Sequence, residues 1–120
     1  MPFKSILQDL VQSTAGATGA ILIDWEGEAV DLYSPAANEF DIKIFGAHQN
    51  IIFNRIREIR QRVPSQTVSN TVITTDQLHA ILGAIGNDYT LVTTLERNAL
   101  VGRALMSVER AIKLLEKEIY

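Results

Sequence analysis

The stretch Gly19-Ala20-Ile21-Leu22-Ile23-Asp24-Trp25-Glu26-Gly27-Glu28-Ala29-Val30 decides the fold of this chain of 120 residues. Its first half is a short, continuous apolar run, which is typical of a strand buried on both faces. Residues 24–27 read as a turn in which Gly27 can adopt a positive φ. Residues 28–33 read as the return strand, so the stretch predicts a β-hairpin.

Helical and strand patterns extend outward from this hairpin. Apolar residues recur at helical spacing over residues 3–14, 39–62 and 99–119, with Asn38 and Asn98 as predicted N-caps of the second and third helices. Three more strands are predicted at residues 67–74, 78–85 and 89–95, and the short turns between them require antiparallel neighbours.

The resulting order of elements is α-β-β-α-β-β-β-α. It predicts an α/β (α+β) fold in which helices cover both faces of one five-stranded antiparallel sheet. The length fits a single domain over residues 1–120.

The composition narrows the class of protein. Hydrophobic residues make up 47% of the chain, charged residues 21%, and the formal net charge is -3. No long basic run occurs, which argues against nucleic-acid binding. No apolar segment approaches the ~18 residues of a membrane span, and the N-terminus does not read as a signal peptide. We therefore expect a cytoplasmic protein without direct membrane insertion.

Residues that could carry chemistry are few. The chain has no Cys, so it has no thiolate nucleophile and no thiolate metal site. Its two histidines, His48 and His79, lack the spacing of a ligand pair, and no nucleophile elbow or phosphate-binding loop occurs. An acidic cluster in the hairpin is interpreted as a solvated turn; it comprises Asp24, Glu26, Glu28 and Asp31. We predict no catalytic residue, no metal site and no cofactor.

The second predicted helix has more apolar residues than one narrow face can hold. One arc is predicted to dock on the sheet; it contains Ile42, Phe45, Ile52, Ile56, Ile59 and Val63. Ile44 and Ile51 lie on a flank beside His48 and Arg55. Two interpretations stay open: a broad core stripe with arginine side chains reaching past it to water, or a flank that packs on a second copy of the chain.

The third predicted strand adds an independent indication of self-association. It is rich in Thr, Ser and Val and contains no Lys, Glu or Asp, so it would be an unprotected strand if it lies at an edge. Twofold pairing of two such edges would place the second helices side by side. The predicted dimer interface comprises Ile44, His48, Ile51, Arg55, Thr67, Ser69 and Thr71.

The hairpin quoted above, the order of elements and the long second helix resemble the Roadblock/LC7 domain family over nearly the whole chain. The resemblance implies a profilin- and longin-like fold, and dimers formed through the second helix and third strand. It also implies a non-catalytic role. Some members attach to dynein motors, and others scaffold Ras-like small GTPases. Members similar to MglB act on a small GTPase of the MglA type and supply no catalytic group.

The resemblance leads to a functional hypothesis. A homodimer presents its second helices to a Ras-like GTPase and modulates the nucleotide state or location of that GTPase. The predicted partner-binding residues are those that point away from the predicted core: Lys43, Asn50, Asn54, Arg57 and Gln61. A motor or trafficking adaptor and a small-ligand sensor are the alternatives, and a sensor would need a sizeable internal pocket.

Overall fold

The computed structural model describes residues 3–35, 39–58 and 68–120, and within residues 39–44 it describes the side chain of Lys43 alone. The elements are α1 (Phe3–Ser13), β1 (Ala17–Ile23), β2 (Ala29–Tyr33), α2 (Glu39–Arg57), β3 (Asn70–Thr74), β4 (Leu78–Ile85), β5 (Tyr89–Glu96) and α4 (Val101–Ile119). The predicted order of helices and strands is confirmed.

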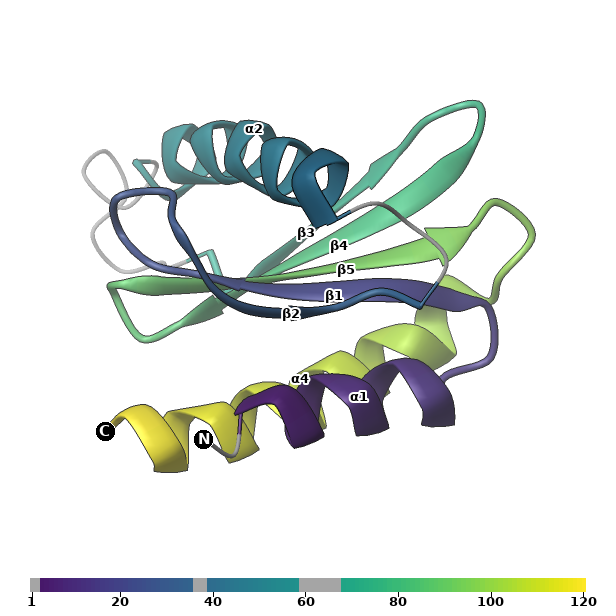
Figure 1. Ribbon diagram of the computed structural model, residues 1–120. Coiled ribbons are helices and arrows are strands. Elements are labelled where there is room, and N and C mark those ends of the chain that lie inside the picture. Colours follow the sequence, from purple (N-terminus) through teal and green to yellow (C-terminus); the bar gives the residue numbers. More distant parts are fainter. Residues whose placement is uncertain (1–2, 36–38, 59–67) are drawn as a thin grey trace.

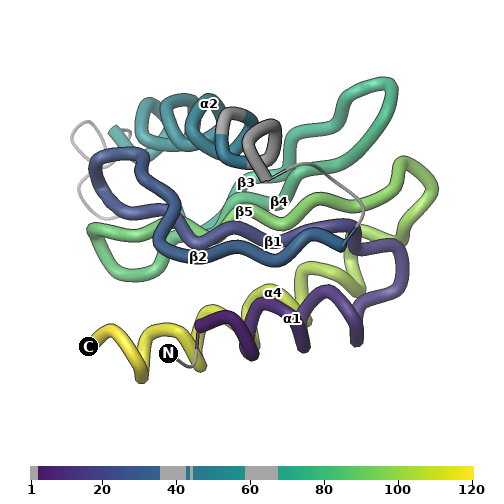
Figure 2. The backbone as a smooth tube through the Cα atoms, in the orientation of Figure 1, coloured from purple at the N-terminus to yellow at the C-terminus, as the bar shows by residue number. Residues whose placement is uncertain are grey.

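The five strands form one antiparallel sheet in the order β2-β1-β5-β4-β3. Helix α2 covers one face of the sheet, and α1 and α4 lie side by side on the other (Figure 1). The backbone trace shows the same three layers (Figure 2). The prediction of helices on both faces is therefore confirmed.

Each face of the sheet has its own apolar core, because successive strand residues point to opposite sides. Ile21 and Ile23 of β1 pack with Phe53 of α2, whereas Leu22 packs with residues of α1 and α4 such as Leu115. The central strands β1, β4 and β5 are buried on both faces, which is why they read as near-continuous apolar runs.

The first hairpin has the turn that its sequence predicts. Gly27 has a φ of 85°, a value that glycine adopts without strain. The Oδ1 atom of Asp24 accepts hydrogen bonds from the backbone N–H groups of Glu26 and Glu28, at 2.9 and 3.0 Å. Asp24 therefore orders the turn. Within the described residues, no group of three or more His, Cys, Asp and Glu side chains could hold a metal ion.

His79 is a packed histidine and not part of a ligand cluster. It is 8% exposed, and its Nε2 atom donates to the backbone oxygen of Arg97 at 2.8 Å. Its Nδ1 atom lies 2.7 Å from the hydroxyl of Thr74, which donates to it. These two bonds tie the β3–β4 hairpin to the turn that precedes α4.

The start of α4 differs from the prediction. Leu100, and not Asn98, is the N-cap residue, with φ -85° and ψ 97° and no side-chain hydrogen bond to the helix. The reason is that Ala99 still belongs to the preceding turn, in which its N–H donates to the oxygen of Glu96. The other predicted N-cap, Asn38, lies outside the described residues. In the parts of the chain that the structure describes, no helix is long and apolar enough to cross a membrane.

Candidate interaction site

Helix α2 approaches the sheet at its smallest residue. A Cβ atom at Gly46 would lie 2.9 Å from the Cδ1 atoms of both Ile21 and Ile23, so glycine lets the helix backbone come close to β1. Phe53, two turns further along, is fully buried in the core on this side of the sheet. The helix therefore docks along the line from Gly46 to Phe53.

This orientation differs from the one that the apolar spacing predicts. Ile52, predicted to dock on the sheet, is 45% exposed, whereas Phe53, which is not in the predicted docking arc, is 0% exposed. Asn50, predicted to contact a partner, is only 3% exposed, so that prediction is wrong. At about 100° per residue, Asn50 lies on the same side of the helix as Gly46 and Phe53. The helix is turned by roughly a quarter of a turn from the predicted orientation.

The opposite side of α2 carries apolar residues that no other described element covers. Ile51 is 60% exposed and Ile52 is 45% exposed. The exposed residues His48 and Arg55 lie on the same side, at about 100° per residue. We call His48, Ile51, Ile52 and Arg55 the α2 outer surface. Neighbouring apolar side chains on a solvent-facing helix are typical of a contact surface.

Arg57 is engaged within the domain. Its Nη1 and Nη2 atoms donate to the backbone oxygens of Asn87 and Tyr89, at 3.1 and 2.9 Å. Its guanidinium lies 4.8 Å from the centroid of the Phe53 ring. Burial lowers the pKa of Arg57 from its ordinary value, because desolvation disfavours the cation. Arg57 thus fixes the end of α2 to the β4–β5 turn, a role that the sequence did not predict.

Strand β3 lies at an edge of the sheet and pairs only with β4 among the described strands. Its register places Thr71 opposite Leu82 and Ile73 opposite Ala80, and both β4 residues belong to the core beneath α2. Thr71 and Ile73 therefore face the layer that α2 occupies. A strand edge without a partner presents backbone groups that can pair with a second strand.

The other predicted site residues divide into two groups. Lys43 and Asn54 are exposed on α2, and Ser69 is exposed beside β3. Thr67, Gln61 and the side chain of Ile44 lie outside the described residues. Ile52 is a surface residue that the helical spacing did not predict. The signal was available, because a narrow helix face cannot bury both Ile51 and its direct neighbour Ile52.

The described surface is also hollowed on the side of α1 and α4. An open hollow of about 400 Å³ lies between the end of α1 and the start of α4 and is lined by residues such as Thr14 and Arg103. A second, of about 310 Å³, lies between α4 and the strands β3 and β4, beside Ile112. Neither is an enclosed pocket inside the apolar cores.

Solved Roadblock/LC7 domains share this architecture. The Roadblock/LC7 domain from Streptomyces avermitilis matches with a TM-score of 0.86 at 16% identity, over 96% of this chain and 95% of that chain. MglB from Myxococcus xanthus matches with a TM-score of 0.86 at 13% identity, over 99% and 95%. Profilin IB from Acanthamoeba castellanii matches with a TM-score of 0.64 at 14% identity, over 98% and 99%.

No protein-family profile and no curated protein matches the sequence. Identities of 13% to 16% establish a common fold and leave function open, because one fold serves many functions. The predicted resemblance is thus confirmed for the fold, which is nearer to the Roadblock/LC7 domains than to profilin. The chain has the fold of a Roadblock/LC7 domain in the form found in MglB.

Proposed function

We propose that this protein is a non-catalytic, dimeric regulator or scaffold in the cytoplasm that binds a Ras-like small GTPase of the MglA type. It modulates the nucleotide state or the location of that GTPase. The observation that carries the proposal is the α2 outer surface, with Ile51 and Ile52 exposed to solvent, together with the edge of β3 that no other described strand pairs with.

The first step of the proposal is self-association. Burial of an exposed isoleucine contributes about 1.5–3 kcal/mol, so Ile51 and Ile52 favour a contact that removes them from water. The edge of β3 can add backbone hydrogen bonds to the same contact, since Thr71 and Ile73 face the layer of α2. A second copy of the chain offers both features at once, and a twofold axis satisfies both copies.

The second step is a surface for the GTPase. Lys43 and Asn54 are exposed, and at about 100° per residue they lie on the flank of α2, between the line that docks on the sheet and the α2 outer surface. Two paired α2 helices would present two such pairs on one platform. Asn50 is removed from the proposed contacts by its burial, and Arg57 contributes by holding the end of α2 in place.

The fold supports a regulatory role of this kind. Proteins similar to MglB act on a small GTPase without supplying a catalytic group, which is the role that the family resemblance implies. A platform that prefers one conformation of the GTPase shifts its population by the difference in affinity for the two states.

Two alternatives remain as outcomes of the test. A motor or trafficking adaptor would use the same surfaces without sensing nucleotide. A small-ligand sensor is disfavoured by the bulk of the side chains in the cores, such as the fully buried Phe53 and Leu82, which leave little room for a ligand.

The test pairs the purified protein with the Ras-like GTPases of its own host, each loaded with GDP or with a GTP analogue. Affinity is measured by titration, and GTP hydrolysis is followed in parallel with GTP-loaded protein. We expect tighter binding of the GTP form and faster hydrolysis. Binding without nucleotide preference would support an adaptor, and the absence of binding to every GTPase would refute the proposal.

A matched pair of variants locates the contact. Lys43→Glu on α2 should weaken GTPase binding about tenfold, which corresponds to 1.4 kcal/mol. Lys117→Glu makes the same change of charge on α4, on the opposite face of the sheet from α2, and should leave the affinity unchanged. Lys117 is exposed, and no ion pair among the described residues involves it. Equal losses in both variants would show that attraction is not specific to α2.

A further inference from the structure

Helix α4 carries a row of basic and apolar residues along its outer face. The row comprises Arg103, Met106, Arg110, Lys113, Leu114 and Lys117, and all six side chains are exposed. At about 100° per residue they fall within a single arc of roughly 100° on the side away from the sheet. We call these six residues the α4 basic row.

Among the residues that the structure describes, the four cations of the row have no ionic partner. Within the described residues the ion pairs are Lys4 with Asp31 and Arg55 with Glu58, and neither involves α4. The acidic residues of α4 lie to the sides: Glu109 and Glu116 flank the row on one side and Glu118 on the other. A protein with a net charge of -3 thus concentrates four of its 11 Lys and Arg residues on one helix face.

Two large apolar side chains interrupt the charges. Met106 is 64% exposed and Leu114 is 47% exposed. They are eight positions apart, which corresponds to about 12 Å along the helix axis. Charged residues alone would be explained by solubility. Exposed Met and Leu between unpaired cations indicate a surface that is covered by a partner.

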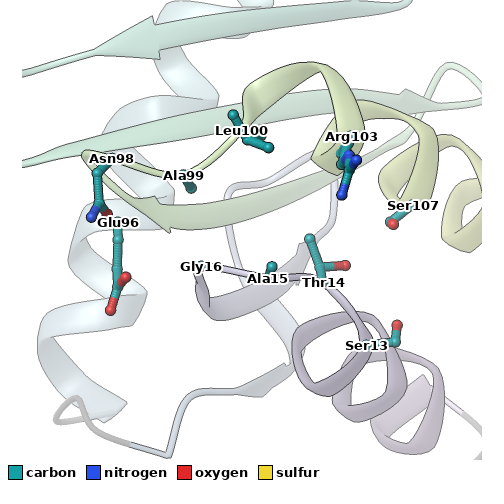
Figure 3. Close-up of a pocket in the computed structure, with 10 residues that line it drawn as sticks. All are labelled: Ser13, Thr14, Ala15, Gly16, Glu96, Asn98, Ala99, Leu100, Arg103 and Ser107. Atoms are coloured by element: carbon teal, nitrogen blue, oxygen red, sulfur yellow. The ribbon is translucent and has the colours of Figure 1, made fainter.

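The row ends at its N-terminal side in the hollow of about 400 Å³ between α1 and α4. Thr14 and Arg103 stand on opposite sides of this hollow, with Ser107 nearby, whereas Glu96 lies at its far rim with the carboxylate directed away from Arg103 (Figure 3). Thr14 is 7% exposed, and its Oγ1 atom has no hydrogen-bond partner in the described part of the chain.

The backbone N–H groups at the N-terminus of α4 add hydrogen-bond donors at this end of the row. Its N-cap Leu100 offers no side-chain oxygen to the helix, and the first turn contains no acidic residue. The first N–H groups of α4 therefore lack a side-chain acceptor, and the helix dipole favours a negative charge there. Arg103 lies in the same turn, so a carboxylate can be bound at this end of the row.

We propose that the α4 basic row is a docking surface for an acidic protein segment that lies along α4. Carboxylates of the segment pair with Arg103, Arg110, Lys113 and Lys117, and its apolar residues cover Met106 and Leu114. A flat anionic membrane fits less well, because it would also meet Glu109, Glu116 and Glu118 on both flanks. A narrow segment avoids them. This surface lies across the sheet from α2, so it does not depend on the proposed GTPase contact.

The test uses a fluorescein-labelled peptide of about 15 residues, rich in Glu and Asp, with two Leu eight positions apart to match Met106 and Leu114. A second peptide carries Ser in place of both Leu. Binding to the full protein is measured by fluorescence anisotropy at low and physiological salt. We expect saturable, salt-dependent binding, with the Leu peptide about tenfold tighter than the Ser peptide, a difference of 1.4 kcal/mol.

Variants distinguish the row from general attraction. Arg110→Glu should weaken the binding of the Leu peptide about tenfold, whereas Lys4→Glu, with the same change of charge off the row, should not. Met106→Ser with Leu114→Ser should abolish the preference for the Leu peptide and leave the binding of the Ser peptide unchanged. Circular dichroism checks that each variant is folded.

Three outcomes would overturn the proposal. The first is equal losses in Arg110→Glu and Lys4→Glu, and the second is no preference between the two peptides. The third concerns vesicles of phosphatidylcholine and phosphatidylserine, tested by co-sedimentation. If the protein binds them and Arg110→Glu abolishes that binding, while neither peptide binds, the row is a membrane contact.

Discussion

Gly16 joins two turns that are far apart in the sequence. Its φ of 85° places it in the left-handed region, and a Cβ atom there would lie 2.5 Å from the Cβ atom of Ala99. Its backbone oxygen accepts a hydrogen bond of 2.7 Å from the N–H of Glu96. One residue without a side chain therefore holds the α1–β1 turn against the β5–α4 turn. Gly27 has the same φ but nothing within 4 Å of its missing Cβ.

Substitutions of Gly16 and Gly27 distinguish the cost of backbone strain from the cost of a steric clash. Gly27→Ala should lower the free energy of unfolding by about 1–2 kcal/mol, the cost of the left-handed conformation for a residue with a Cβ. Gly16→Ala carries the same cost and should lose a further ~1–3 kcal/mol because its methyl group overlaps Ala99. Urea unfolding at one protein concentration measures both values. Equal losses would mean that the two turns are not in contact.

At the scale of elements, α2 is where the sequence analysis and the structure diverge. The strands were predictable, and the predicted bounds of β4 match residue for residue, because a buried run between turn residues has few other solutions. The face of α2 that docks on the sheet was not predictable from the sequence. The apolar residues of α2, such as Phe45, Ile51, Ile52 and Phe53, point in several directions around the helix axis, so periodicity alone does not select one face. Contact between Gly46 and β1 selects it, and that contact appears only in three dimensions.

The docking face of α2 also decides which predicted site residues are exposed. His48, Ile51 and Arg55, predicted to form a flank of α2, are exposed on its outer side. Lys43 and Asn54, predicted to face away from the core, are exposed on a flank nearer the sheet. Asn50 was misplaced because the predicted docking arc differs from the observed one by roughly a quarter of a turn, which put Asn50 on the predicted outer side. The edge position of β3 could not be predicted from the sequence, because strand order is set by contacts between distant segments.

The docking of α2 through Gly46 can be tested against a second helical glycine. Gly46→Ala gains helix propensity, about 0.5–1 kcal/mol in a helix interior. Gly102 is the second residue of α4, where the same substitution gains less. Gly102 has nothing within 4 Å of a Cβ position, so its substitution should raise stability. The Cβ of Gly46→Ala meets Ile21 and Ile23, and overpacking should cost about 1–3 kcal/mol. Thermal unfolding that shows equal stabilisation of both variants would contradict this docking.

At the scale of the whole molecule, the sheet separates two surfaces of different character. Helices α2 and α4 lie on opposite faces of the sheet (Figures 1 and 2). The α2 outer surface combines two exposed isoleucines with His48 and Arg55, and the α4 basic row is cationic with two apolar residues. A dimer built through α2 and β3 would leave both copies of α4 facing outward. The protein could then hold a GTPase near α2 and an acidic segment along each α4 at the same time, as a scaffold requires.

The dimer is the premise of that arrangement, and it can be tested first. Light scattering coupled to size-exclusion chromatography should give twice the mass of the chain for the unmodified protein. Ile51→Asp places a charge in the centre of the proposed contact and should shift the protein to the monomer. Leu100→Asp is the matched control, because Leu100 is 64% exposed against 60% for Ile51.

The control variant Leu100→Asp also changes the N-cap of α4. Asp is a favourable N-cap and lies at the positive end of the α4 dipole, so Leu100→Asp should keep the dimer and retain full stability. If the unmodified protein is a monomer, or if both variants dissociate, the proposal of a dimer contact through α2 is refuted. Dissociation in Ile51→Asp alone, at unchanged helix content, would establish that the exposed isoleucines serve self-association and that each α4 is free to bind another partner.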